Sequence, residues 1–202
     1  MQKSIDSFRF GKYNIDIKFP KRKELKGNNM DGKKLKEEFI EYFGEEKWNQ
    51  EKVLADVRQV VFDVCERWLG IKPVPVLFNK DIGTDEARLD VKERVIWLNP
   101  KNQNKWIELL DSTIHELEHL YQITYVASSD TPKAKRWKKE LDNYIGGEDP
   151  LGNLMQEIEL DARAFSQVVL ATDYGISYKH EDPIIQLLIE HYIKSGKMLS
   201  ED

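Results

Sequence analysis

The stretch that decides the fold is Thr113-Ile114-His115-Glu116-Leu117-Glu118-His119-Leu120-Tyr121-Gln122. It contains the pattern His-Glu-x-x-His, whose two histidines project from the same side of a helix about one turn apart. Two imidazoles in that arrangement can reach one metal ion. The glutamate after the first histidine, Glu116, then stands beside the open position of the metal, where a water is activated for attack. The pattern is typical of zinc hydrolases.

The periodicity of the same helix predicts that its histidines line a cleft. Apolar residues recur at helical spacing and form a stripe that we expect to be buried, namely Ile107, Leu110, Ile114, Leu117 and Tyr121. The expected polar row beside it consists of Glu108, Ser112, His115, His119 and Gln122. The alternative is a wet helix face on which both histidines make ordinary hydrogen bonds. Histidines that flank a buried stripe are better placed to line a cleft, which favours the metal site.

Composition bounds the class of protein and its partners. The chain has 202 residues, 40% hydrophobic and 33% charged, which suits one globular domain with a substantial core. Its net charge of −5 provides no general attraction to nucleic acid or to an anionic membrane. We therefore expect neither as a partner.

The compartment is predicted from cysteine usage and from the N-terminus. Cys65 is the single cysteine, so no internal disulfide can form and nothing requires an oxidising compartment. The first residues lack the apolar core of a signal peptide, and no apolar run reaches the roughly 18 residues of a membrane span. These features predict a cytoplasmic protein.

The N-terminal region is predicted to be peripheral. Residues 8–19 alternate between apolar and polar side chains, which predicts a short β-hairpin. A basic, turn-rich segment follows, and we interpret it as a solvated link because no aromatic residue is interleaved for base stacking. The predicted division is a hairpin arm and basic link over 1–32 and a single domain over 33–202.

The remaining pattern predicts short strands followed by helices. Expected helices cover 33–43, 47–69, the metal-binding stretch, a segment from Pro132, 150–172 and 183–194, and expected strands cover 74–78, 87–90 and 94–98. The last helix is expected to turn Ile184, Leu187, Leu188 and Tyr192 inward. This order predicts an α+β domain.

The strand Val95–Leu98 leads directly to the metal-binding helix. We expect it to lie along the cleft, where a free edge can pair with an extended peptide. The alternative is a strand that only supports the sheet.

A third ligand is needed, because catalytic zinc normally takes three protein ligands and keeps one position for water. The acidic segment 157–161 can supply it through Glu157 or Glu159. These two residues lie about 200° apart around a helix, so only one can face the histidines.

The chain resembles the gluzincin branch of the His-Glu-x-x-His zinc metallopeptidases, and within it the small intracellular ImmA/IrrE-like members. The resemblance covers about residues 87–170 and rests on the strand Val95–Asn99, the metal-binding helix and the segment Glu159-Leu160-Asp161-Ala162-Arg163-Ala164-Phe165. It implies a zincin-like metallopeptidase domain, with a small antiparallel or mixed sheet followed by helices packed around the metal-binding helix. In that family the glutamate opening the last segment binds zinc, which favours Glu159. Asp161 is then available to orient a ligand histidine.

The function expected from these features is a zinc-dependent peptidase acting on a protein or peptide substrate. Its predicted ligands are His115, His119 and Glu159, and Glu116 is the predicted general base. Two alternatives stay open: a regulatory or binding protein that retains a metallopeptidase frame, and another zinc hydrolase such as an amidase. An open groove would favour a peptide substrate, and a closed pocket would favour a small molecule. The donor to the oxyanion is left open among Tyr121, Tyr125, Tyr144, Tyr174, His180 and His191.

Overall fold

The structure is a computed structural model, and it describes residues 36–37, 40–41, 44–146 and 149–199. The chain divides into two compact units, residues 1–48 and 49–202. The hairpin predicted at 8–19 and the basic link after it lie outside the described residues. The site and the core belong to the second unit.

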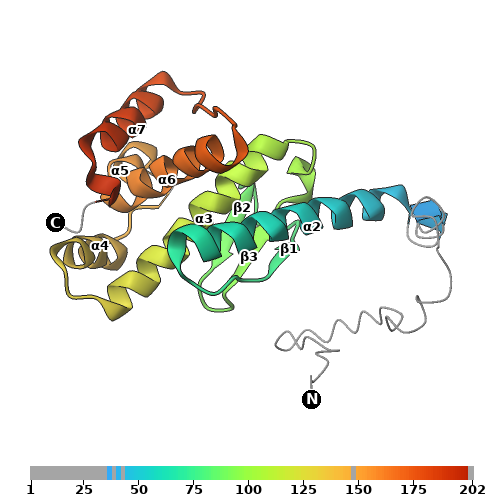
Figure 1. Ribbon diagram of the computed structural model, residues 1–202, viewed down its shortest axis with the longest axis horizontal. Helices are drawn as coiled ribbons and strands as arrows, with labels where there is room; N and C mark the ends of the chain where they lie inside the picture. The colour runs from blue at the N-terminus through green and yellow to red at the C-terminus, as the bar shows by residue number, and fades with distance from the viewer. Residues whose placement is uncertain (1–35, 38–39, 42–43, 147–148, 200–202) are drawn as a thin grey trace, which may run out of the picture. The chain divides into compact units, whose positions relative to one another are not determined.

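The second unit combines a small sheet with helices (Figure 1). The strands are β1 (Val76–Phe78), β2 (Ala87–Asp90) and β3 (Val95–Leu98). The helices are α2 (Glu45–Val64, which begins in the first unit), α3 (Trp106–Ser128), α4 (Pro132–Asp142), α5 (Pro150–Leu154), α6 (Glu157–Tyr174) and α7 (Pro183–Ser195), with a π-helical turn at Cys65–Leu69 and 3-10 turns at Pro100–Asn102 and Lys197–Leu199. The prediction of an α+β chain is confirmed: the fold is mostly helical, with one mixed three-stranded sheet.

The strand order of the sheet is β1-β3-β2. β3 pairs in parallel with β1 and antiparallel with β2, so both of its edges are occupied. The expectation of a free edge on Val95–Leu98 is therefore wrong. Within the described part of the chain, the outer edge of β2 is the one that pairs with no strand on that side. The error arises because the alternation of side chains shows which residues form a strand but not which strand is central. The burial of Ile96 and Leu98, both 0% exposed, fits the central position.

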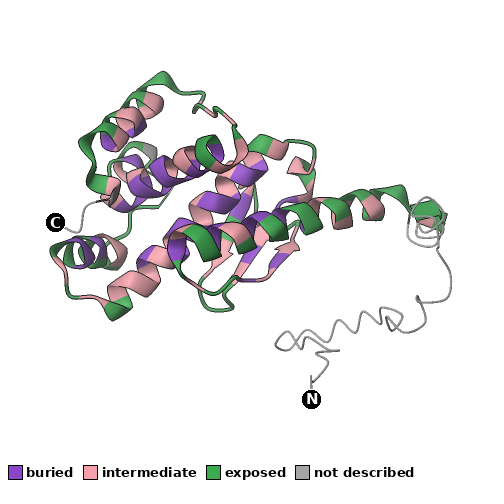
Figure 2. Ribbon diagram, in the orientation of Figure 1, coloured by how far each residue is buried: buried purple, intermediate pink, exposed green. Residues whose placement is uncertain are grey.

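Helix α3 runs through the core between the sheet and α6 (Figure 1). Its predicted stripe is buried at Leu110, Ile114 and Leu117, and these residues join a cluster to which α2 contributes Val57 and Val61. Figure 2 shows buried residues along both α3 and α6.

Two residues near the ends of α3 differ from the prediction. Ile107, assigned to the stripe, is 39% exposed. Gln122, assigned to the polar row, is 0% exposed. The helical period assigned Gln122 to a solvent-exposed face, but α6 packs on that face and buries the Gln122 side chain.

The helix expected over 150–172 is two helices, α5 and α6. They are separated at Gln156, whose backbone is extended (ψ 135) and whose side chain bonds the backbone N–H and carbonyl of Ile145. Beyond this break, the Glu140 carboxylate of α4 accepts hydrogen bonds from the backbone N–H groups of Glu157 and Ile158, both at 3.0 Å. The break gives α6 an N-terminus of its own and brings Glu159 into its first turn.

We expect Glu140→Ala to lower the free energy of unfolding by about 1–2 kcal/mol, because a carboxylate that caps a helix N-terminus is worth about that much. The measurement is urea denaturation, with Lys139→Ala on the same helix as the control. An unchanged midpoint would show that the contact contributes nothing to stability.

Helix α7 packs on α6 through Ile189 and Tyr192, which are 1% and 5% exposed. The inward orientation expected for Ile184 and Leu187 is wrong, since they are 65% and 67% exposed. The face of α7 that meets α6 is therefore rotated around the helix axis from the predicted face. Of the two residues that make this contact, Tyr192 was predicted to face inward and Ile189 was not. Among the described residues, no helix is both long enough and apolar enough to cross a membrane.

Candidate metal centre

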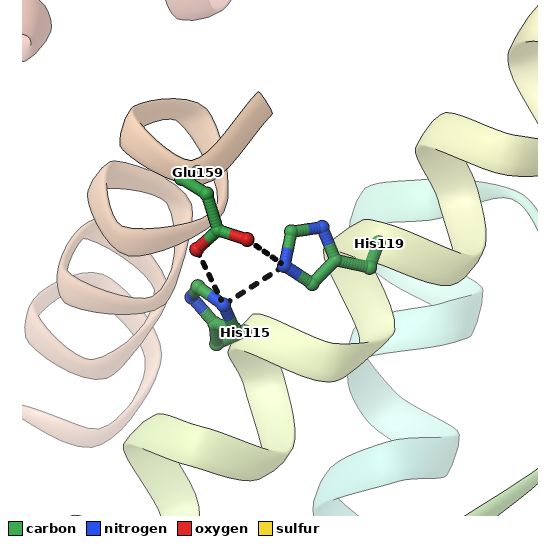
Figure 3. A group of neighbouring side chains, drawn as sticks. All are labelled: His115, His119 and Glu159. Atoms are coloured by element: carbon green, nitrogen blue, oxygen red, sulfur yellow. Dashed lines mark hydrogen bonds and ion pairs between the residues drawn. The ribbon is translucent and has the colours of Figure 1, made fainter. Parts of the chain in front are cut away.

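Three side chains from two helices converge beside α3 (Figure 3). His115 and His119 lie one turn apart on α3, and their Nε2 atoms are 2.9 Å from each other. Glu159 of α6 places Oε2 3.5 Å from His115 Nε2 and Oε1 3.3 Å from His119 Nε2. Together the three residues could hold a metal ion.

The spacing of these donors fits a tetrahedral ion. Bonds of about 2.0–2.1 Å at tetrahedral angles set neighbouring ligand atoms about 3.3 Å apart. The two imidazole nitrogens are 2.9 Å apart, and each lies close to that value from a different oxygen of Glu159: His119 Nε2 is 3.3 Å from Oε1 and His115 Nε2 is 3.5 Å from Oε2. The Glu159 side chain is 3% exposed and each imidazole 15%, so the group is mostly shielded from water while its histidines keep some access to it.

Glu157 and Glu159 face different directions, as their angular separation on a helix requires. Glu157 turns to the surface, where its Oε2 accepts a hydrogen bond of 3.1 Å from Arg136 Nε. Glu159 is the carboxylate that reaches the two imidazoles. Its role as a metal ligand remains a prediction.

The pKa values of His115, His119 and Glu159 show which of these three side chains are charged. Burial alone would raise the pKa of Glu159, but its hydrogen bonds with His115 and His119 hold that pKa well below the usual range. Burial also opposes a charge on His119, yet Glu159 and Glu116 outweigh it and raise the pKa of His119 to about 9. Burial and the neighbouring His119 lower the pKa of His115 to about 4. The carboxylate therefore stays ionised, and a cation between the three groups is favoured.

Glu116 lies next to the group and faces the sheet. Its Oε2 accepts a hydrogen bond of 2.8 Å from the backbone N–H of Leu89 in β2, which fixes the carboxylate against that strand. Burial raises the pKa of Glu116. A hollow of about 210 Å³ opens here, and its walls include His115, Glu116, Asp111 and Arg163. The predicted general base thus lines this hollow together with His115.

Other residues of the site were not assigned a role from sequence, or were left among several candidates. The Tyr144 hydroxyl donates a hydrogen bond of 2.7 Å to Glu159 Oε1. Arg163, one turn after Glu159, lines the hollow. The i+4 spacing of Arg163 from Glu159 was the sequence signal that could have identified Arg163.

Asp161 was expected to orient a ligand histidine, but its carboxylate accepts hydrogen bonds from Tyr192 and Gln122. The side chain that contacts His119 is Gln122.

No known protein family matches the chain, and no curated protein or solved structure with significant similarity to it was found.

Proposed function

We propose that the protein is a zinc-dependent peptidase with a zincin-like domain of the gluzincin kind. The observation that carries the proposal is the convergence of His115, His119 and Glu159 beside a hollow that also holds Glu116. A structural zinc site fills all four metal positions with protein ligands and needs no general base. Three donors with a partly buried carboxylate beside them fit a catalytic site better.

The residues divide the chemistry between them. His115, His119 and Glu159 would hold the ion, which when bound supplies Lewis acidity and lowers the pKa of a water to about 7. Glu116 accepts the proton of the attacking water and returns it to the leaving amine. Its raised pKa makes it a stronger base than an exposed glutamate, and the Leu89 N–H keeps it in position.

The substrate that best fits the β2 edge and the hollow beside Glu116 is an extended peptide. Among the residues that the structure describes, no strand pairs with the outer edge of β2, and the backbone N–H of Leu89 donates to Glu116. A peptide that adds a strand at this edge would pass beside the base. The adjoining hollow of about 210 Å³ is smaller than the roughly 300–1,000 Å³ of pockets that enclose a small ligand. These features support a peptidase over an amidase for small molecules.

Arg163 is the proposed donor to the substrate carbonyl oxygen. Its Nε–H is buried and has no hydrogen-bond partner among the described residues. Its ion pair with Glu159 is long, with Nη2 3.9 Å from Oε2. The Arg163 side chain as a whole is 29% exposed and lines the hollow, so its guanidinium is suited to bind an oxygen that arrives with the substrate. A guanidinium aimed at the developing oxyanion would stabilise the transition state.

We expect Arg163→Met to lower kcat by about 10²–10³-fold while the metal is retained, since losing one oxyanion donor typically costs that much. The measurement combines metal content with steady-state kinetics, and Arg136→Met, which removes the partner of Glu157, is the control. Loss of metal from Arg163→Met would instead show that Arg163 serves to hold Glu159.

The experiment that tests the function as a whole is a zinc-dependence assay on a peptide library. The protein is stripped with a chelator, reloaded with zinc and incubated with the library, and new peptide termini are detected by mass spectrometry. We expect cleavage to require zinc and to be absent in His115→Ala but retained in His191→Ala, an exposed histidine on α7. If the protein binds zinc stoichiometrically but cleaves no peptide of the library, the result would favour the alternative of a binding protein.

A further inference from the structure

We infer that Gln122 is a positioning residue of the metal centre: it holds the His119 proton on Nδ1 and so directs the Nε2 lone pair toward His115 and Glu159. The inference rests on the metal centre of the proposed function, although it does not depend on what the protein cleaves. Gln122 lies one turn after His119 on α3 and is fully buried. Its Oε1 is 2.8 Å from His119 Nδ1.

The orientation of the Gln122 amide follows from its other partner. Its Nε2 donates a hydrogen bond of 2.9 Å to the Ile158 carbonyl of α6, with Asp161 Oδ2 at 3.4 Å on the same side. A carbonyl oxygen can only accept, so the NH₂ end of the amide must face Ile158. The opposite orientation would place two buried acceptor oxygens 2.9 Å apart. Gln122 therefore presents its oxygen to His119.

This orientation decides which nitrogen of His119 carries the proton. An amide oxygen is only an acceptor, so Nδ1 must be the donor and must keep its hydrogen. A histidine that binds a metal ion is neutral, so with the metal bound the free lone pair of His119 is on Nε2. That is the nitrogen that faces His115 Nε2 at 2.9 Å and Glu159 Oε1 at 3.3 Å. The hydrogen bond from Nδ1 also prevents rotation of the ring, as outer partners of metal-binding histidines generally do.

Gln122 also connects the two helices that supply the donors. Through Ile158 it bonds the peptide group that immediately precedes Glu159, and through His119 it bonds a donor on α3. The Gln122 amide thus fixes the orientation of the His119 ring and links α6 to α3 by a hydrogen bond next to Glu159. No sequence pattern required an amide here, because the partner carbonyl lies 36 residues away along the chain.

The test measures zinc affinity and the state of the His119 ring, neither of which needs a substrate. We expect Gln122→Met to bind zinc about 10–100-fold more weakly in competition with a chromophoric chelator, the usual effect of losing an outer partner. The control is Gln167→Met, which removes an amide from α6 outside the metal centre.

Nitrogen-15 NMR of the zinc-loaded wild type provides a readout that a merely structural role would not produce. Two-bond N–H correlations should place the His119 proton on Nδ1, and this proton should exchange slowly with water. A proton on Nε2, or Gln122→Met with wild-type zinc affinity, would overturn the inference. The wild-type spectrum decides even if Gln122→Met does not fold. A protein that binds zinc in this manner and cleaves no peptide would refute the peptidase alone, whereas a wild type that binds no zinc would refute both.

Discussion

Glu116→Gln is expected to keep stoichiometric zinc and to lose about 10²–10⁴-fold of its hydrolytic rate, the range attributed to a positioned general base. The substitution suits this site because the glutamine oxygen can still accept the hydrogen bond from Leu89 N–H. The side chain would therefore keep its place, and the change removes only its ability to take a proton. Because Glu116 is absent from the donor group, metal content should not fall.

The measurement is kcat on the best peptide from the library, together with zinc content by mass spectrometry. Glu108→Gln is the matched control, since it is the same substitution on the same helix about two turns earlier. If Glu116→Gln hydrolyses the peptide at the wild-type rate, the proposed mechanism is wrong, whatever the metal content of the variant.

Glu159→Ala and Glu157→Ala are expected to give opposite results for metal binding. Glu159→Ala removes one of three donors, and we expect zinc affinity to fall by more than about 100-fold, beyond the range for losing an outer partner. Glu157→Ala removes a surface ion pair with Arg136, of the kind worth about 0–1 kcal/mol, and should leave zinc affinity unchanged.

The two variants are matched in residue type, in helix and in size of change, so their comparison isolates the direction each side chain faces. Isothermal titration with zinc measures the affinities, and circular dichroism checks that both variants fold. Equal losses in the two would mean that the N-terminus of α6, and not the Glu159 carboxylate, supports the site. A loss confined to Glu157→Ala would move the ligand to that residue.

Local features of the fold were predictable because their causes lie within a few residues. The stripe of α3 follows from helical period, and the end of the helix that starts at Glu45 follows from Gly70, which adopts the left-handed backbone (φ 62) that glycine allows. Pro132 stands at the first helical position of α4, where the sequence predicted that this helix begins, and the structure adds that the Thr131 side chain caps it. The break at Gln156 was missed because its cause, a contact with Ile145 and the cap from Glu140, spans more than ten residues.

By itself, the sequence determined that His115 and His119 share one face of a helix, because four residues make about one turn whatever surrounds the helix. It also limited the third donor to two glutamates that cannot both face that helix. Only the tertiary structure decided which of the two faces the histidines, and it also decided that β3 is central and that Gln122 is buried. Each of these depends on how α6 or β1 packs against a segment far away in the chain. That packing is set by the sum of many buried contacts, so no single spacing in the sequence contains it.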